Sequence, residues 1–213
     1  WRKGYLEGWQ MAASFQMLNS RDLIWSRRVR EYLLGERGSL VDLMAWNADT
    51  TRMPYRMHSE YLRHLYMNND LAEGRWQVDG QPVTVADIRV PLFVVGTLRD
   101  HVAPWRSVYK IHLLNDSDIS FVLTSGGHNA GIVSEPGRPR RSYQIATRKA
   151  GARYRNPAQW QADTPMHEGS WWPAWSAWLA HNASAQVAPP PMGGKSGSGK
   201  TLGAAPGTYV MQK

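Results

Sequence analysis

Two apolar stretches of strand length constrain this fold more than any other feature. Residues 90–96 read Val-Pro-Leu-Phe-Val-Val-Gly, and residues 119–123 read Ile-Ser-Phe-Val-Leu. Continuous apolar runs of this length suit strands that are covered on both faces, as in a parallel sheet. A helical pattern over residues 107–114 lies between them, so the segment predicts a strand–helix–strand unit. We therefore expect an α/β fold.

The first third of the chain predicts helices. Residues 5–18 are apolar on most sides, which predicts a substantially buried helix. A second helix over residues 23–33 would end at Gly35, a residue that suits a helix C-terminus. Residues 57–69 repeat apolar side chains at four-residue spacing, which favours a third helix.

The remaining segments predict smaller elements around the two strands. Residues 76–83 favour a hairpin with a tight Asp-Gly turn. Residues 170–179 predict a last helix, and Trp171, Trp175 and Trp178 would share the face that packs on the sheet. From about residue 182 the chain is rich in Ala, Pro, Gly and Ser, a composition that cannot bury a core, so we expect a flexible tail.

Composition excludes several kinds of site. The 213 residues contain no cysteine, so this polypeptide holds no disulfide, iron–sulfur cluster, zinc-thiolate site or thiol nucleophile. The histidines have no metal-ligand spacing, and no metal is expected. The apolar stretches are too short to span a bilayer, so no transmembrane segment is expected.

The net charge of +8 has a local origin. Residues 137–156 hold seven basic side chains and no acidic one. Such a segment can attract phosphates, but a solvated loop is the simpler interpretation. No DNA- or RNA-binding motif accompanies it, so no nucleic-acid partner is expected.

The sequence supports neither a nucleotide-binding phosphate loop nor the serine nucleophile elbow of hydrolases. Residues 194–201 (Gly-Lys-Ser-Gly-Ser-Gly-Lys-Thr) match a phosphate-binding loop in form. That motif needs a strand before it and a helix after it, and the Pro- and Gly-rich flanks provide neither. No Gly-x-Ser-x-Gly nucleophile elbow occurs. The match is therefore attributed to composition.

An acid and a histidine follow the two predicted strands. Asp100 comes just after the first strand, and His128 comes just after the second. In a parallel sheet both would lie at the carboxyl edge, where open α/β sheets carry their active sites. A carboxylate there can accept the Nδ1–H of a histidine and fix its tautomer. The order acid then histidine is also that of hydrolase-fold triads, in which the nucleophile comes earlier.

Several motifs, in order along nearly the whole chain, resemble polyhydroxyalkanoate synthases, the bacterial polyester polymerases. The matching segments are residues 5–11 (Tyr-Leu-Glu-Gly-Trp-Gln-Met), 22–26, 46–54 (Trp-Asn-Ala-Asp-Thr-Thr-Arg-Met-Pro), 61–63, 100–108 (Asp-His-Val-Ala-Pro-Trp-Arg-Ser-Val), 125–131 (Ser-Gly-Gly-His-Asn-Ala-Gly), 169–175 (Gly-Ser-Trp-Trp-Pro-Ala-Trp) and 206–210. The type resembled is the single-polypeptide, class I synthase, and the segment is its C-terminal part.

The resemblance implies an α/β-hydrolase fold with a mainly helical cap. Residues 1–85 would belong to the cap, residues 86–181 to the C-terminal part of the catalytic core, and residues 182–213 to the tail. In this family a cysteine takes the (R)-3-hydroxyacyl group from coenzyme A as a thioester. The substrate is therefore a coenzyme A thioester, and no cofactor is implied.

The resemblance also implies roles for individual residues. His128 would be the general base, and Asp100 would orient His128 or help to activate the 3-hydroxyl of the incoming group. His101, next to Asp100, is a second candidate for the catalytic site, although structural support is the favoured interpretation of this residue. Trp46, Asn47 and Asp49 would lie in the cap and shape the substrate entrance or a subunit contact.

The implied partners are the acyl-coenzyme A, the growing polyester chain, the surface of the polyester granule and a second subunit in a homodimer. The implied location is the cytoplasm, at the granule. The missing cysteine departs from the family, and we expect that it lies in a preceding segment, so that this chain alone is inactive. Two alternatives stay open: a non-catalytic module that binds acyl-coenzyme A or granules, and a fragment of an esterase-like hydrolase.

Overall fold

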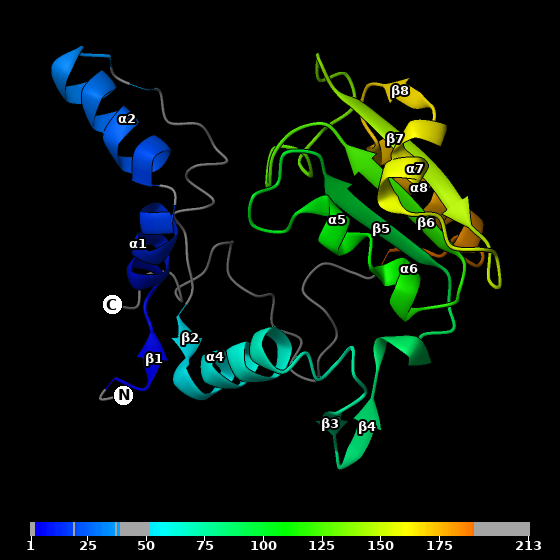
Figure 1. Ribbon diagram of the computed structural model, residues 1–213. Helices are drawn as coiled ribbons and strands as arrows, with labels where there is room; N and C mark the ends of the chain where they lie inside the picture. Colours follow the sequence, from blue (N-terminus) through cyan, green and yellow to red (C-terminus); the bar gives the residue numbers. More distant parts are fainter. Residues whose placement is uncertain (1–2, 19, 37, 39–51, 190–213) are drawn as a thin grey trace. The chain divides into compact units, whose positions relative to one another are not determined.

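The computed structural model describes residues 3–18, 20–36, 38 and 52–189 (Figure 1). The chain forms two compact units. The first unit comprises Trp1–Leu92, Tyr109–Ile119 and Thr147–Asn156, and the second comprises Phe93–Val108, Ser120–Ala146 and Pro157–Lys213. In the described part of the chain, no helix combines the length and the hydropathy that a membrane crossing needs.

A four-stranded sheet forms the centre of the second unit, with the strand order β5-β6-β7-β8. The strands are β5 (Leu92–Thr97), β6 (Ile119–Thr124), β7 (Ser142–Arg148) and β8 (Met166–Glu168). The two predicted strands are β5 and β6, and they are neighbours. The prediction of an α/β architecture is confirmed at this level.

The sheet is mixed rather than purely parallel. The Leu92 N–H donates to the Asp118 carbonyl and the Leu98 N–H to the Thr124 carbonyl, so partners advance together along β5 and β6, as in a parallel pair. Strands β7 and β8 are antiparallel. A parallel β5–β6 pair is the part that places both strand ends at one edge.

Strand β7 corrects the interpretation of the basic segment. Its seven residues lie inside the range 137–156, which was expected to be a solvated loop. The stretch 142–147 (Ser-Tyr-Gln-Ile-Ala-Thr) contains β-branched and aromatic residues that fit a pleated strand. The arginines before and after this stretch dominated the charge pattern and concealed it.

One face of the sheet carries a cluster of three aromatic rings. Trp160 of α7 (Pro157–Asp163) lies edge-on to Phe121 of β6, with ring centroids 5.2 Å apart. Trp105, the first residue of α5 (Trp105–Val108), lies 6.4 Å from each of these rings. All three side chains are buried, so they form the core on this face.

The other face packs against the Trp-rich helix α8 (Trp172–Asn182). A Cβ at Gly96 would point at Trp105 and Phe121, and alternation along β5 places Phe93 on the opposite face. Phe93 stacks on Trp171 at 6.2 Å and lies 5.4 Å from Trp178. The predicted packing is therefore confirmed for Trp171 and Trp178, whereas Trp175 lies against the Trp171 ring and is 40% exposed.

The first unit is mainly helical. Its elements are β1 (Tyr5–Leu6), α1 (Gly8–Leu18), the π-helical η1 (Arg21–Trp25), α2 (Ser26–Arg28), the π-helical η2 (Val29–Leu33), β2 (Met53–Pro54), α4 (Tyr55–Tyr61), the π-helical η3 (Leu62–Met67), β3 (Trp76–Val78), β4 (Gln81–Val83), the 3₁₀ helix η4 (Val85–Asp87) and α6 (Ile111–Leu114). The expected helices and hairpin are present. Asp79 and Gly80 both have positive φ, as the predicted tight turn requires.

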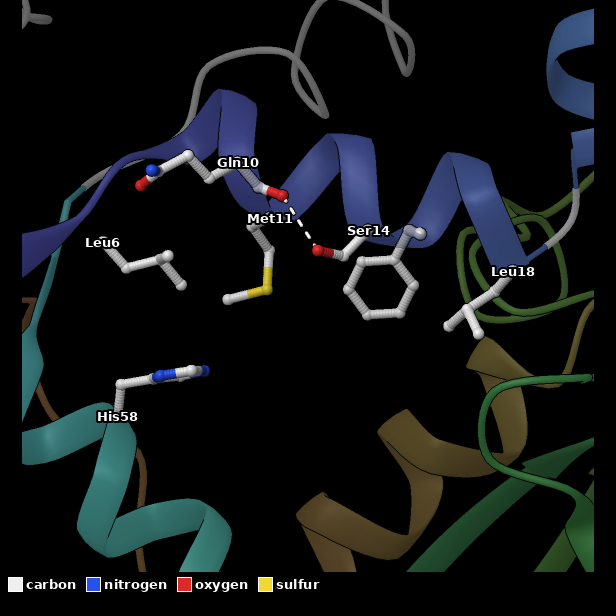
Figure 2. Close-up of a pocket in the computed structure, with 7 residues that line it drawn as sticks. Leu6, Gln10, Met11, Ser14, Leu18 and His58 are labelled. Carbon is white, nitrogen blue, oxygen red and sulfur yellow. Dashed lines mark hydrogen bonds between the residues drawn. The ribbon is translucent and has the colours of Figure 1, made fainter.

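The expected burial of the first helix is wrong for the described residues. Helix α1 contains no buried residue, and Trp9 and Met17 are 66% and 75% exposed. An open pocket of about 300 Å³ lies between α1 and α4 (Figure 2). It is lined by Leu6, Gln10, Met11, Ser14, Phe15, Leu18 and His58. The apolar residues of a helix indicate how much surface the helix could bury. The actual burial depends on which other parts of the chain pack against it.

His112 of α6 is a buried histidine in the first unit, and its ring lies 4.4 Å from that of Tyr109. Burial, together with the charges of Arg148 and Arg155, lowers the pKa of His112 to about 4. The folded protein therefore resists protonating His112 over a range where the unfolded chain, with a pKa near 6.5, takes up the proton.

We expect this difference to weaken the fold in mild acid. Above pH 6.5 His112 is neutral in both the folded and the unfolded chain, so the free energy of unfolding has its full value. It decreases as the pH falls from 6.5 toward 4, because only the unfolded chain binds the proton there. Urea unfolding between pH 7 and 4 should show a smaller loss of unfolding free energy for His112→Phe than for the unchanged chain. The exposed His181 provides the control, His181→Gln. Equal pH slopes for all three proteins would contradict the assignment.

Candidate functional site

Asp100 lies in the loop after β5, and both oxygens of its side-chain carboxylate accept hydrogen bonds. Oδ1 accepts the backbone N–H groups of Val102 and Ala103, both at 2.8 Å. Oδ2 lies 3.3 Å from the Thr97 hydroxyl and 2.9 Å from Nδ1 of His128. An aspartate readily closes a turn on the N–H groups two and three residues ahead, and this local turn holds the side chain still.

These contacts keep Asp100 ionised. Burial alone would raise the pKa of the carboxyl group, whose side chain is 7% exposed. The hydrogen bonds from Ala103, His128 and Val102 outweigh burial and hold the pKa of Asp100 below its ordinary value. The site therefore contains a fixed negative charge at neutral pH.

His128 lies in the segment after β6, opposite this charge. Its Nδ1 is 2.9 Å from Oδ2 of Asp100, although the two residues are 28 positions apart in the sequence. A carboxylate oxygen can only accept, so Nδ1 is the protonated nitrogen. The side chain is 48% exposed, so the ring is accessible from solvent. The structure thus brings together the two residues that the strand ends were expected to juxtapose.

Glycines make the tight shape of the segment that carries His128. Gly126 has φ of 113°, a conformation that side chains disfavour. A Cβ at Gly131 would lie 2.7 Å from Cγ2 of Thr97 and 2.9 Å from the Gly127 carbonyl oxygen. The segment therefore packs directly on the end of β5, from which the Asp100 loop leaves.

The other candidate residues do not join this pair. His101 is exposed next to Asp100, and within the described residues no hydrogen bond connects it to Asp100 or His128. Trp46, Asn47 and Asp49 lie outside the described residues. The roles expected for His101 and for these three residues therefore stay predictions.

A second acid–histidine pair lies in the first unit, and no sequence pattern pointed to it. Nδ1 of His64 is 2.6 Å from Oδ2 of Asp70, and Nε of Arg75 donates to Oδ1 of Asp70 at 3.0 Å. The Arg75 guanidinium already neutralises this carboxylate, and the three residues come from one short stretch of chain. The pair closes the end of η3 and lacks the strand-end setting of Asp100 and His128.

Residues that support the His128 segment were also missed. The hydroxyl of Thr97 approaches Asp100, and the indole N–H groups of Trp171 and Trp172 donate to carbonyls just beyond His128. The sequence around His128 carries no sign of which donors hold this segment.

The arrangement can move a proton. An imidazole whose Nδ1–H is held by a carboxylate accepts a proton at Nε2, and the carboxylate stabilises the resulting cation. The sequence contains no cysteine that could serve as a thiol nucleophile beside it. Among the described residues, no group of three His, Asp or Glu side chains is placed to hold a metal ion.

The chain is similar to poly(3-hydroxyalkanoate) polymerases. It is 41% identical to that of Methylorubrum extorquens over 99% of this chain and 34% of the relative. It is 38% identical to the polymerase subunit of Cupriavidus necator over 98% of this chain and 35% of the relative. It is 34% identical to polymerase 2 of Ectopseudomonas oleovorans over the whole chain and 37% of the relative. The chain thus spans about a third of the length of these relatives, and it matches no protein-family model.

Gly131 should be far less tolerant of a side chain than Gly127 in the same segment. Gly131→Ala places a methyl group against Thr97 and the Gly127 carbonyl, whereas a Cβ at Gly127 meets nothing nearer than 3.7 Å. We expect Gly131→Ala to lose about 1–3 kcal/mol of unfolding free energy in urea, as overpacked sites do. Adding Thr97→Ser, which removes Cγ2, should restore part of the loss. A Gly127→Ala protein that is destabilised as strongly as Gly131→Ala would contradict this packing.

Proposed function

The chain is related in sequence, over nearly its whole length, to a C-terminal part of the poly(3-hydroxyalkanoate) polymerases, and we propose that it carries the acid–base pair of such a polymerase. The observation that carries the proposal is the 2.9 Å contact between Asp100 and His128 at the ends of neighbouring parallel strands. That setting is where α/β enzymes place catalytic side chains. The whole protein would transfer (R)-3-hydroxyacyl groups from coenzyme A to a polyester chain.

The fold that goes with this proposal is an α/β hydrolase with a helical cap. The parallel β5–β6 pair, covered by α5 and α7 on one face and α8 on the other, fits the C-terminal part of such a core. The mainly helical segment before residue 86 fits a cap. We keep the boundaries 1–85, 86–181 and 182–213 as part of the proposal.

The first half of the proposed reaction loads the enzyme. Nε2 of His128 takes the proton from a cysteine thiol, and the thiolate attacks the thioester carbonyl of the acyl-coenzyme A. The C–S bond to coenzyme A breaks, and the leaving thiolate receives the proton from His128. The products are an acyl-cysteine thioester and free coenzyme A, with His128 neutral again.

The second half extends the polymer. His128 takes the proton from a 3-hydroxyl group, either of the incoming acyl group or of the chain end, and the oxygen attacks the acyl-cysteine thioester. An ester bond forms, the C–S bond to the enzyme breaks, and the cysteine sulfur receives the proton. Both halves use the same open nitrogen, which is consistent with the half-exposed ring of His128.

Asp100 would act through His128 rather than on the substrate. Its Oδ1 is occupied by two backbone donors, and its Oδ2 by His128 and Thr97. A carboxylate with this many donors has little acceptor capacity left for a substrate hydroxyl. This occupancy supports an orienting role for Asp100, in which it fixes the tautomer of His128 and stabilises the protonated ring.

The nucleophilic cysteine would come from outside these 213 residues. The chain contains no cysteine, and it spans only about a third of the relatives' length. The relation to the polymerases further suggests a homodimer associated with polyester granules in the cytoplasm. These assignments rest on the resemblance alone.

Activity should depend on both the missing cysteine and His128. We expect no release of coenzyme A from (R)-3-hydroxybutyryl-coenzyme A by this chain alone. We expect release once the chain is fused to the N-terminal part of the C. necator relative, which under the proposal supplies the cysteine. In that fusion His128→Ala should lower kcat/KM by about a thousandfold or more, as loss of a triad base does. The matched control, His181→Ala at an exposed position of α8, should leave activity unchanged. Release by the chain alone that survives His128→Ala would overturn the proposal.

A further inference from the structure

Three consecutive residues, of which the last begins α8, hold the backbone just beyond His128. The indole N–H of Trp171 donates to the Gly131 carbonyl at 3.1 Å, and that of Trp172 donates to the Ile132 carbonyl at 3.0 Å. The Ser170 hydroxyl donates to the Ser134 carbonyl. These bonds join segments that lie 36 to 40 positions apart in the sequence, so they are a feature of the tertiary fold.

The bond from Trp171 is buried, whereas that from Trp172 is exposed. Trp171 and Gly131 are both buried, so neither the indole N–H nor the carbonyl can turn to water as an alternative partner. A buried donor or acceptor left without a partner is costly, and the indole has no other polar atom. The Thr124 hydroxyl is the second donor to this carbonyl, at 3.3 Å.

The same tryptophan also contacts the strand that leads to Asp100. Its ring stacks on Phe93 of β5 with a centroid distance of 6.2 Å, and the ring of Trp175 lies 5.7 Å away. Trp171 therefore contacts both segments that carry the acid–histidine pair. Its ring packs on β5, which leads to Asp100, and its N–H donates to the segment that carries His128.

Packing alone does not account for this geometry. A phenylalanine at position 171 could fill much of the same space against Phe93, but it could not donate to the Gly131 carbonyl. His128 itself is half exposed, so its own packing does little to fix it, and its place opposite Asp100 depends on the backbone. That backbone is held by its own bonds, such as that from the Gly131 N–H to the Gly127 carbonyl, and by the indole donors.

We propose that Trp171 and Trp172 are positioning residues for His128, which act through the indole bonds to the carbonyls of Gly131 and Ile132. The inference rests on the proposed function for its catalytic meaning, whereas its structural content is testable on this chain alone. Trp171 should have the larger effect, because its bond is buried and that of Trp172 is more exposed.

Nitrogen-15 NMR of the histidine rings in the 213-residue chain provides the test, with the His128 signals assigned by their loss in His128→Gln. In the unchanged chain we expect one tautomer, protonated at Nδ1. Trp171→Phe should speed exchange of this Nδ1 proton with water by about tenfold, the effect of losing one buried hydrogen bond. Trp172→Phe should speed it by a smaller factor, about threefold, since a more exposed bond contributes less.

Trp178→Phe is the matched control. Trp178 also packs on Phe93, and within the part of the chain that the structure describes no hydrogen bond joins it to the His128 segment. We expect no change in the exchange of the His128 proton. Equal exchange in Trp171→Phe and the unchanged chain would overturn the inference, as would an equal acceleration in Trp178→Phe. Should Trp171→Phe fail to fold, the less buried Trp172→Phe decides in its place, and unchanged exchange there overturns the inference.

Asp100→Asn separates this inference from the proposed function. The amide oxygen of an asparagine would stay on the N–H groups of Val102 and Ala103, so its NH₂ would face His128 and favour the tautomer protonated at Nε2. A flip with Asp100→Asn but no effect of Trp171→Phe refutes the positioning role alone. No flip with Asp100→Asn shows that the pair itself is not formed, and then both the positioning role and the proposed function fail.

Discussion

The parallel pairing of β5 and β6 is the constraint on which the candidate site depends. Parallel strands deliver their carboxyl ends to one edge, so the loops that leave them start side by side. Asp100 follows β5 by three residues, and His128 follows β6 by four. Had the two strands been antiparallel, the same residues would lie at opposite edges of the sheet.

Asp100 and His128 are not only close but also held in a defined geometry, because each residue is fixed by its own loop. Asp100 is held by the turn it closes on Val102 and Ala103, which also keeps its charge. His128 is held through its backbone, by glycines that permit the tight course of the chain and by donors from the start of α8. A carboxylate that is both ionised and immobile is what an imidazole needs to keep one tautomer.

The sequence predicted the parts of this arrangement that depend on local pattern. Residues 90–96 and 119–123 showed both strands, and the order of Asp100 and His128 after them was enough to expect their contact. Strand β7 was missed because the arginines around residues 142–148 dominate that segment's composition. The burial of α1 was overestimated because apolar residues reveal what a helix can cover and not what the folded chain places against it.

The role of the tryptophans shows a different limit. Their shared face predicted packing on the sheet, and Trp171 and Trp178 do pack on Phe93. Such a pattern does not reveal the hydrogen bond of the indole N–H. Its acceptor is a carbonyl about forty residues earlier, and the direction of that carbonyl depends on Gly126 and Gly131. Long-range donors to irregular backbone are set by tertiary structure, so they are read from coordinates rather than from periodicity.

The exposure of His128 links this geometry to the rest of the proposed enzyme. In this chain the His128 ring is about half exposed to water. Water can therefore compete with a thiol or a hydroxyl group as the partner in proton transfer to Nε2. Covering the ring would exclude water and strengthen its attraction to the buried Asp100 carboxylate, because charges interact more strongly in a low dielectric. The segment that supplies the cysteine would therefore do two things under the proposed function: it would bring the sulfur to Nε2, and it would make the existing pair a better base.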